Sequence, residues 1–222
     1  MKLAIFNGSP RKKKSNSTLL INQFLNGYAK IHDEVVPVHY IAKRNKIEEM
    51  LQEFRDAEIV LIIFPLYTDC MPGIVKEFIE DINGLTFSKP KKIGFIVQSG
   101  FPEAIHSTFV ERYLQKLTQR LGCEYLGTVI KGGVEGIQIM PPQMTKKLFG
   151  RFHELGKWFA ENNSFSPEIV EKLRHPYKMS KTRRIGFSLI RLTGLTNYYW
   201  NSNLKKHGAY QNRFDRPFID EN

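Results

Sequence analysis

The sequence predicts an α/β fold in which a five-stranded, doubly wound parallel sheet carries helices on both faces. Between residues 3 and 161, five short apolar segments alternate with five patterns of helical periodicity. Strands connected through helices pair in parallel by right-handed crossovers. The segment Ala57–Phe64 (AEIVLIIF) is the most apolar in the protein. Such a run is typical of a strand buried on both faces, as parallel sheets require.

The first half of the chain contains three of these strands. Leu3–Phe6 is a short apolar run, and the turn-forming sequence NGSP that follows ends it. In Ser17–Ile31, apolar residues recur at every fourth position and therefore line one face of a helix. Val35–Tyr40 is a β-rich segment whose proline suits a strand at the edge of the sheet. The other elements are a helix at Ile47–Phe54, the strand Ala57–Phe64 and a helix at Pro72–Ile82.

The second half contains two further strands and then changes character. We expect strands at Lys92–Gln98 and Tyr125–Ile130, and helices at about Ile105–Leu121 and Thr145–Glu161. The polar sequence NNSFSP at residues 162–167 predicts a boundary between a domain at 1–162 and a C-terminal extension at 163–222. Within the extension, Pro167–Leu173 and Lys181–Asn197 have helical patterns, and its aromatic residues predict an ordered, packed end.

Composition favours a soluble protein. The chain is 41% hydrophobic but has no apolar run of eighteen residues, and Met1-Lys2 leads straight into a strand, so we expect a cytoplasmic location. Two cysteines, Cys70 and Cys123, are too few for an iron–sulfur cluster and lack metal-ligand spacing, so we expect both to be buried and no metal site. The net charge is +11, and ten basic but no acidic residues lie between Lys172 and Arg213. That basic stretch suits a solvated face, nucleic acid, an anionic membrane surface or an acidic partner.

Residues 9–18 follow the first strand and combine hydroxyl, amide and cationic groups just before a helix. Free backbone N–H groups and the positive end of the helix dipole make such a position an anion site. The turn lacks the Gly-x-Gly-x-x-Gly of dinucleotide sites and the Gly-Lys-Ser/Thr of nucleoside-triphosphate loops. These features favour a terminal monophosphate. For Ser15 or Ser17, capping of the helix is the alternative role.

Two other turns follow the third and fourth strands. Because ligands of doubly wound sheets bind beyond the carboxyl ends of the strands, we expect residues 9–18, 65–73 and 98–101 to converge on one crevice. The turn at 65–73 mixes a tyrosine, apolar side chains and backbone amides, which together suit a planar ring with a polar edge.

About residues 1–160 resemble the NAD(P)H-dependent FMN reductases of the flavodoxin-like superfamily. The resemblance rests on Gly8-Ser9-Pro10-Arg11, Ser15-Asn16-Ser17-Thr18, Pro65-Leu66-Tyr67, Met71-Pro72-Gly73 and Ser99-Gly100-Phe101. It implies a flavodoxin-like sheet with strand order 2-1-3-4-5. It implies that Ser9, Arg11, Ser15, Ser17 and Thr18 hold the FMN phosphate, with Asn16 in the same loop. It further implies that Pro65, Leu66, Tyr67 and Thr68 line the isoalloxazine, that Met71, Pro72 and Gly73 lie near its pyrimidine edge, and that Ser99, Gly100 and Phe101 form the third side.

The activity implied is transfer of hydride from NADH or NADPH through FMN to a small acceptor such as a quinone, a nitroaromatic or an azo compound. No residue is identified as catalytic, because the flavin carries the chemistry. The resemblance also implies a homodimer. Two alternatives stay open: a flavodoxin-type electron carrier, which the charge of +11 disfavours, and a module that binds nucleic acid or a membrane surface through the basic tail. No nucleic-acid partner is expected, since no recognition-helix or single-strand motif is present.

Overall fold

The computed structural model describes residues 2–87, 90–192, 194 and 197–216. It contains a five-stranded sheet of order β2-β1-β3-β4-β5 in which all neighbouring strands are parallel, so the predicted fold class and strand order are confirmed. The strands are β1 (Leu3–Asn7), β2 (Val38–Tyr40), β3 (Ile59–Pro65), β4 (Lys92–Gln98) and β5 (Glu124–Lys131). Every residue of β1 and β3 is buried, as expected of central strands.

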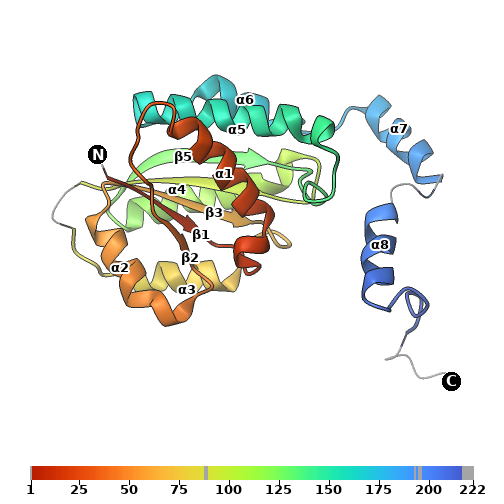
Figure 1. Ribbon diagram of the computed structural model, residues 1–222, viewed down its shortest axis with the longest axis horizontal. Helices are drawn as coiled ribbons and strands as arrows, with labels where there is room; N and C mark the ends of the chain where they lie inside the picture. The colour runs from red at the N-terminus through yellow and green to blue at the C-terminus, as the bar shows by residue number, and fades with distance from the viewer. Residues whose placement is uncertain (1, 88–89, 193, 195–196, 217–222) are drawn as a thin grey trace. The chain divides into compact units, whose positions relative to one another are not determined.

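Helices cover both faces of the sheet, as Figure 1 shows. Alternate side chains of the strands contribute to two separate hydrophobic clusters, one for each face. One face packs against α2 (Ile47–Asp56), α3 (Gly73–Ile82) and α4 (Thr108–Arg120). The other packs against α1 (Asn16–Tyr28), α5 (Pro142–Asn162) and α6 (Pro167–Arg174). Short 3₁₀ helices lie at Lys12–Lys14 (η1), Arg44–Lys46 (η2) and Ala104–Ser107 (η3).

Helices α1 and α5 cross at two glycines that bring their backbones into contact. A Cβ atom built on Gly27 would lie 1.8 Å from the carbonyl oxygen of His153, and one on Gly156 would lie 1.8 Å from that of Phe24. No side chain fits at either position, so only glycine permits this approach. The contact fixes α1, whose first turn carries the predicted anion site, against the helix that follows β5.

The predicted domain boundary at residue 162 differs from the one in the structure. The first compact unit extends to Lys178, and Met179 begins the second. The reason is that Phe165 and Leu173 are buried in the hydrophobic cluster of α1 and α5. The Phe165 ring fills the space left at Gly94 of β4, which has no side chain, because a Cβ on Gly94 would lie 2.9 Å from this ring. Residues 163–178 therefore belong to the first compact unit.

Three further predictions are corrected at the edges of elements. β2 is limited to Val38–Tyr40, and Val35 is 93% exposed, because pairing with β1 begins only at Pro37, whose carbonyl accepts from the Ile5 amide. The helix predicted at Lys181–Asn197 ends at Leu192 (α7); residues 193 and 195–196 lie outside the described part of the chain. Asn197 instead occupies the N-cap position of a helix that the sequence did not predict, α8 (Tyr198–Lys206).

The second unit contains α7, α8 and a turn that ends near Arg213. The guanidinium of Arg213 lies 4.0 Å from the centre of the Tyr210 ring and 4.6 Å from that of Phe214. The sequence predicts a packed end, but Trp200 and Phe214 are 60% and 78% exposed, so this prediction is wrong for these two side chains. Among the helices of the described residues, none combines the length and apolarity needed to cross a membrane.

Candidate functional site

A pocket of about 140 Å³ opens at the carboxyl ends of β1, β3 and β4, where the sequence predicts a crevice. Three turns converge there, one after each strand. Its lining includes eight of the predicted site residues and two residues that were not predicted to bind the ligand. The predicted residues are Ser9, Arg11, Asn16, Pro65, Leu66, Tyr67, Ser99 and Gly100, and the others are Gln98 and Glu135.

The turn after β1 is held together by Asn7, the last residue of the strand. Its side-chain amide donates to Thr18 Oγ1 (3.0 Å) and to Ser15 Oγ (3.5 Å), and its Oδ1 accepts from the Ser9 amide (2.9 Å). Ser15 is the N-cap of α1, and its Oγ accepts from the Thr18 amide at 3.1 Å. The structure therefore gives Ser15 the capping role that the sequence left open, and Ser15 and Thr18 shape the loop.

Gly8 allows this turn to pass close to the neighbouring elements. A Cβ on Gly8 would lie 2.3 Å from the side chain of Val75 and 3.0 Å from that of Phe64. The Gly8 amide donates to the Ile63 carbonyl at 2.7 Å, which ties the turn to the end of β3. Any larger residue would push the turn away from the sheet.

Ser17 and Asn16 have buried polar atoms without a protein partner among the described residues. Ser17 is fully buried, and neither its Oγ nor Asn16 Oδ1 has a hydrogen-bond partner. The other end of the Asn16 side chain is fixed, because its Nδ2 donates to the Val134 carbonyl at 2.7 Å. Buried polar atoms are normally hydrogen-bonded. Two such atoms in the first turn of α1, where backbone N–H groups also lack helical partners, indicate a place for a ligand.

The turn after β3 presents an aromatic side chain at the rim of the pocket. Pro65 and Leu66 are buried, whereas Tyr67 is 48% exposed. A tight turn follows, in which Tyr67 and Cys70 exchange backbone hydrogen bonds of 3.1 and 3.3 Å and Thr68 has a φ of +56°. A positive φ is rare for a β-branched residue, so this turn is strained. Cys70 lies in it and is exposed, so the prediction of two buried cysteines holds for Cys123 and is wrong for Cys70.

Some predicted residues lie near the pocket without lining it. Met71 is buried in the hydrophobic core, and Pro72 and Gly73 begin α3. Their assignment to the pyrimidine edge of the ring stays a prediction. The roles expected for the other predicted residues outside the lining also stay predictions; these residues are Ser15, Ser17, Thr18, Thr68 and Phe101.

The turn after β4 is connected to the segment after β5. The Ser99 amide donates to the Lys131 carbonyl (3.0 Å), and the Val134 amide donates back to the Ser99 carbonyl (3.1 Å). The Gly133 amide donates to the Phe101 carbonyl at 2.8 Å. Phe101 is 42% exposed, and its ring centre lies 4.7 Å from that of His106. The His106 side chain is about 40% exposed and packs on the Phe101 ring.

Glu135 enters the pocket from the segment after β5, which the sequence treated only as a loop. Its carboxylate would lie 3.4 Å from a Cβ on Gly100. The carboxyl-end rule, applied to the fifth strand as well, would have identified this segment. Lys131, at the end of β5, has its pKa lowered by burial and, to a smaller extent, by the charge of Arg151.

A larger hollow of about 670 Å³ lies between α1 and the first half of α5. Its lining is mainly apolar and includes Leu19, Met140 and Phe149. The unpartnered buried atoms of Asn16 and Ser17 do not belong to its lining. We therefore place the candidate site in the smaller pocket, where polar groups converge.

The model of the family described as a flavodoxin-like fold matches residues 1–148, so the chain belongs to that family. Solved structures with a similar fold include an FMN-dependent NADH-azoreductase from Bacillus anthracis in complex with FMN (TM-score 0.53, 16% identity, 72% of this chain and 100% of that one). An NAD(P)H:quinone oxidoreductase from Methanothermobacter marburgensis is similar as well (TM-score 0.54, 14% identity, 70% and 94%). So is an NADPH-quinone reductase from P. pentosaceus (TM-score 0.51, 14% identity, 69% and 96%). No curated protein matches the sequence.

Proposed function

We propose that the protein is an FMN-dependent oxidoreductase that uses NADH or NADPH to reduce a small acceptor such as a quinone, a nitroaromatic or an azo compound. The observation that carries this proposal is the buried, unpartnered hydroxyl of Ser17 in the first turn of α1, beside the pocket at the carboxyl ends of β1, β3 and β4. The names of the structurally similar proteins, which are FMN-dependent and NAD(P)H-dependent reductases, support it.

The residues present fit FMN. The Ser17 hydroxyl and the free N–H groups at the start of α1 are donors for a phosphate, and Arg11 supplies a positive charge. Asn16 Oδ1 is an acceptor and suits a ligand hydroxyl such as those of the ribityl chain. Ser15 and Thr18 act indirectly in this proposal, because they hold the loop in shape.

The rims of the pocket suit a flat ring. We assign Pro65, Leu66 and Tyr67 to one side of it and Ser99 and Gly100 to another, with Phe101 at the mouth. When bound, FMN accepts hydride from a nicotinamide and passes electrons to the acceptor. The protein orients the rings and excludes water. Tyr67 and Phe101 offer exposed aromatic surface against which a nicotinamide or an acceptor can stack.

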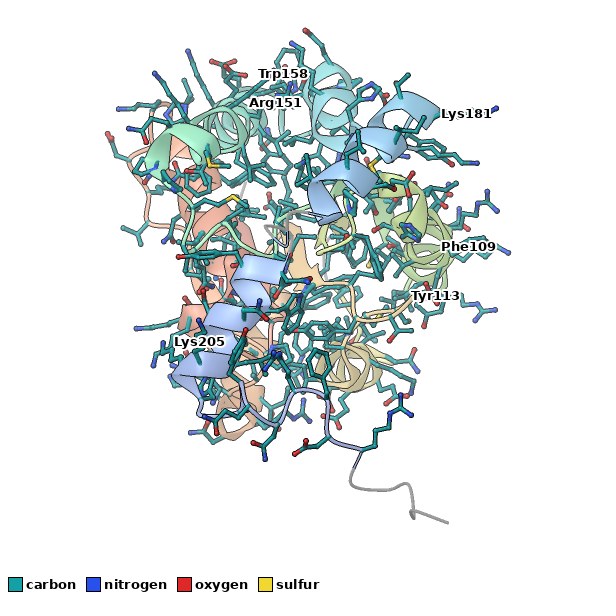
Figure 2. All side chains as sticks on the ribbon, turned by 90° about the vertical axis from the view of Figure 1, so that its right-hand side faces the viewer. Phe109, Tyr113, Arg151, Trp158, Lys181 and Lys205 are labelled. Atoms are coloured by element: carbon teal, nitrogen blue, oxygen red, sulfur yellow. The ribbon has the colours of Figure 1, made fainter. Side chains whose placement is uncertain are left out.

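The expected homodimer and cytoplasmic location remain part of the proposal. Phe109 and Tyr113 support the dimer: they lie four residues apart on α4, are 69% and 45% exposed, and point outward from the core (Figure 2). Exposed aromatic side chains that share one helix face are a common feature of interfaces between proteins.

The test is a pair of titrations of the flavin-free protein, one with FMN and one with riboflavin, which lacks the phosphate. We expect FMN to bind at least about 100-fold more tightly, since hydrogen bonds to a charged group contribute roughly 1.5–3 kcal/mol each. Ser17→Ala should lower the affinity for FMN about tenfold and leave that for riboflavin unchanged. Equal affinities of the wild type for the two flavins would contradict the phosphate assignment.

Reduction is tested separately, by adding NADH or NADPH to the FMN-loaded protein without oxygen and following the loss of flavin absorbance. We expect bleaching by at least one of the two, followed by reoxidation when a quinone, nitroaromatic or azo compound is added. Tight FMN binding without reduction by either nucleotide would favour the electron-carrier alternative.

A further inference from the structure

Residues 174–177 form a connecting segment that contacts the turn after β4 from outside the pocket. The amide of Ala104 donates to the Pro176 carbonyl at 3.0 Å, and the amide of Ile105 donates to the Tyr177 carbonyl at 3.1 Å. Ala104 and Ile105 are the first two residues of η3, so their N–H groups have no partner within that helix. The connecting segment thus caps η3.

An ion pair anchors the connecting segment. The guanidinium of Arg174 binds the carboxylate of Glu111 on α4 through two contacts, one of 3.1 Å between Nη1 and Oε2 and one between Nη2 and Oε1. Both side chains are about a quarter exposed or less, and the paired geometry is the strong form of this interaction. Lys131 Nζ also donates to the His175 carbonyl at 3.4 Å. The segment is therefore fastened to α4 and to the end of β5.

The turn that it caps carries Phe101 and His106, the aromatic pair that we assign to the mouth of the pocket. Phe101 lies three residues before η3, and His106 lies within it. The inner end of this turn is already fixed by the hydrogen bonds of Ser99 and Phe101 with residues 131–134. Its outer end is held by the connecting segment. Because His106 lies on the capped helix η3 and its ring packs on Phe101, a displacement of η3 would move this pair.

We propose that the connecting segment at residues 174–177 positions the Phe101–His106 pair and thereby sets the affinity for the acceptor, with Arg174 as the positioning residue. The proposal rests on the proposed function. Phe101 does not line the pocket, so the effect is expected on the molecule that stacks at the mouth rather than on FMN. The segment lies beyond residues 1–148, which the family model matches.

The test compares Arg174→Ala with Lys172→Ala. Lys172 is on the same helix and pairs with Glu168 within it, so its replacement removes one positive charge from α6 and touches neither α4 nor η3. For Arg174→Ala we expect an acceptor KM raised at least about fivefold, with the FMN affinity and kcat within about twofold of wild type. Lys172→Ala should leave all three unchanged. Arg174→Glu combined with Glu111→Arg restores the pair with its charges exchanged and should bring the KM back toward wild type.

Hydrogen exchange provides a readout that does not depend on activity. The Ala104 and Ile105 amides should exchange slowly in the wild type and in Lys172→Ala, and at least about tenfold faster in Arg174→Ala. If exchange and acceptor KM are the same in both single variants, the proposal is wrong. If exchange accelerates in Arg174→Ala but its KM stays at the wild-type value, the segment is structural only and the proposal is also wrong.

The two proposals fail in different ways. A wild-type protein that binds no flavin, or that no nicotinamide reduces, contradicts the proposed function, and the role in acceptor affinity then falls with it. A wild-type protein that reduces its acceptor while Arg174→Ala behaves like Lys172→Ala contradicts the inference alone.

Discussion

Replacing Gly156 by alanine tests the close contact between α1 and α5. The added Cβ would lie 1.8 Å from the carbonyl oxygen of Phe24, whereas real Cβ atoms essentially never approach another atom within 3.0 Å. The helices must therefore separate by about 1.2 Å or more, and the neighbouring atom is backbone, which cannot rotate away. Overpacking of a core costs about 1–3 kcal/mol and occasionally more, and here we expect the upper end. The higher helix propensity of alanine offsets up to about 1 kcal/mol. The expected net loss is about 2 kcal/mol.

Gly150→Ala is the matched control, because Gly150 lies on the same helix and a Cβ there would meet no atom within 4 Å. Only the propensity gain applies, so this variant should be more stable than wild type by about 0.5–1 kcal/mol. The assay is urea denaturation followed by circular dichroism, with the m-value compared to confirm that the same transition is measured. A Gly156→Ala protein as stable as Gly150→Ala would refute the backbone contact between α1 and α5.

Three other predictions concern the cap, a histidine and the domain boundary. Ser15→Ala should cost about 1 kcal/mol of stability in the absence of flavin, since Ser15 caps α1, whereas Ser17→Ala should not. Equal denaturation midpoints for the two variants would contradict these roles. Burial lowers the pKa of His39, and the charges of Glu53 and Glu49 oppose this shift with smaller effects. As the pH falls, the unfolded chain therefore takes up the proton first, and stability should be lost below about pH 6.5. The loss should be smaller in His39→Gln. Truncation after residue 178 should leave the stability of the first unit unchanged. Truncation after residue 162 should destabilise it, because it removes the buried side chains of Phe165 and Leu173, each worth roughly 1.5–3 kcal/mol. Similar denaturation midpoints for the two truncated proteins would contradict the boundary.

The sequence by itself determined the fold class, the order of the elements and the three turns that carry the candidate site. These follow from local patterns, because the periodicity of apolar residues distinguishes strands from helices, and alternation of the two requires a parallel sheet. The convergence of residues 9–18, 65–73 and 98–101 followed from the rule that ligands bind at the carboxyl ends of such strands. Eight of the sixteen predicted site residues line one pocket as a result.

Only the tertiary structure decided which of two similar serines caps the helix and which keeps a free hydroxyl, since that depends on the neighbours of each side chain. It also assigned residues 163–178 to the first compact unit, because the space that Phe165 fills is made by Gly94, some seventy residues earlier in the chain. The same holds for Glu135 and for the connecting segment at 174–177. Each is placed by contacts between residues far apart in the sequence, and no local pattern reports such contacts.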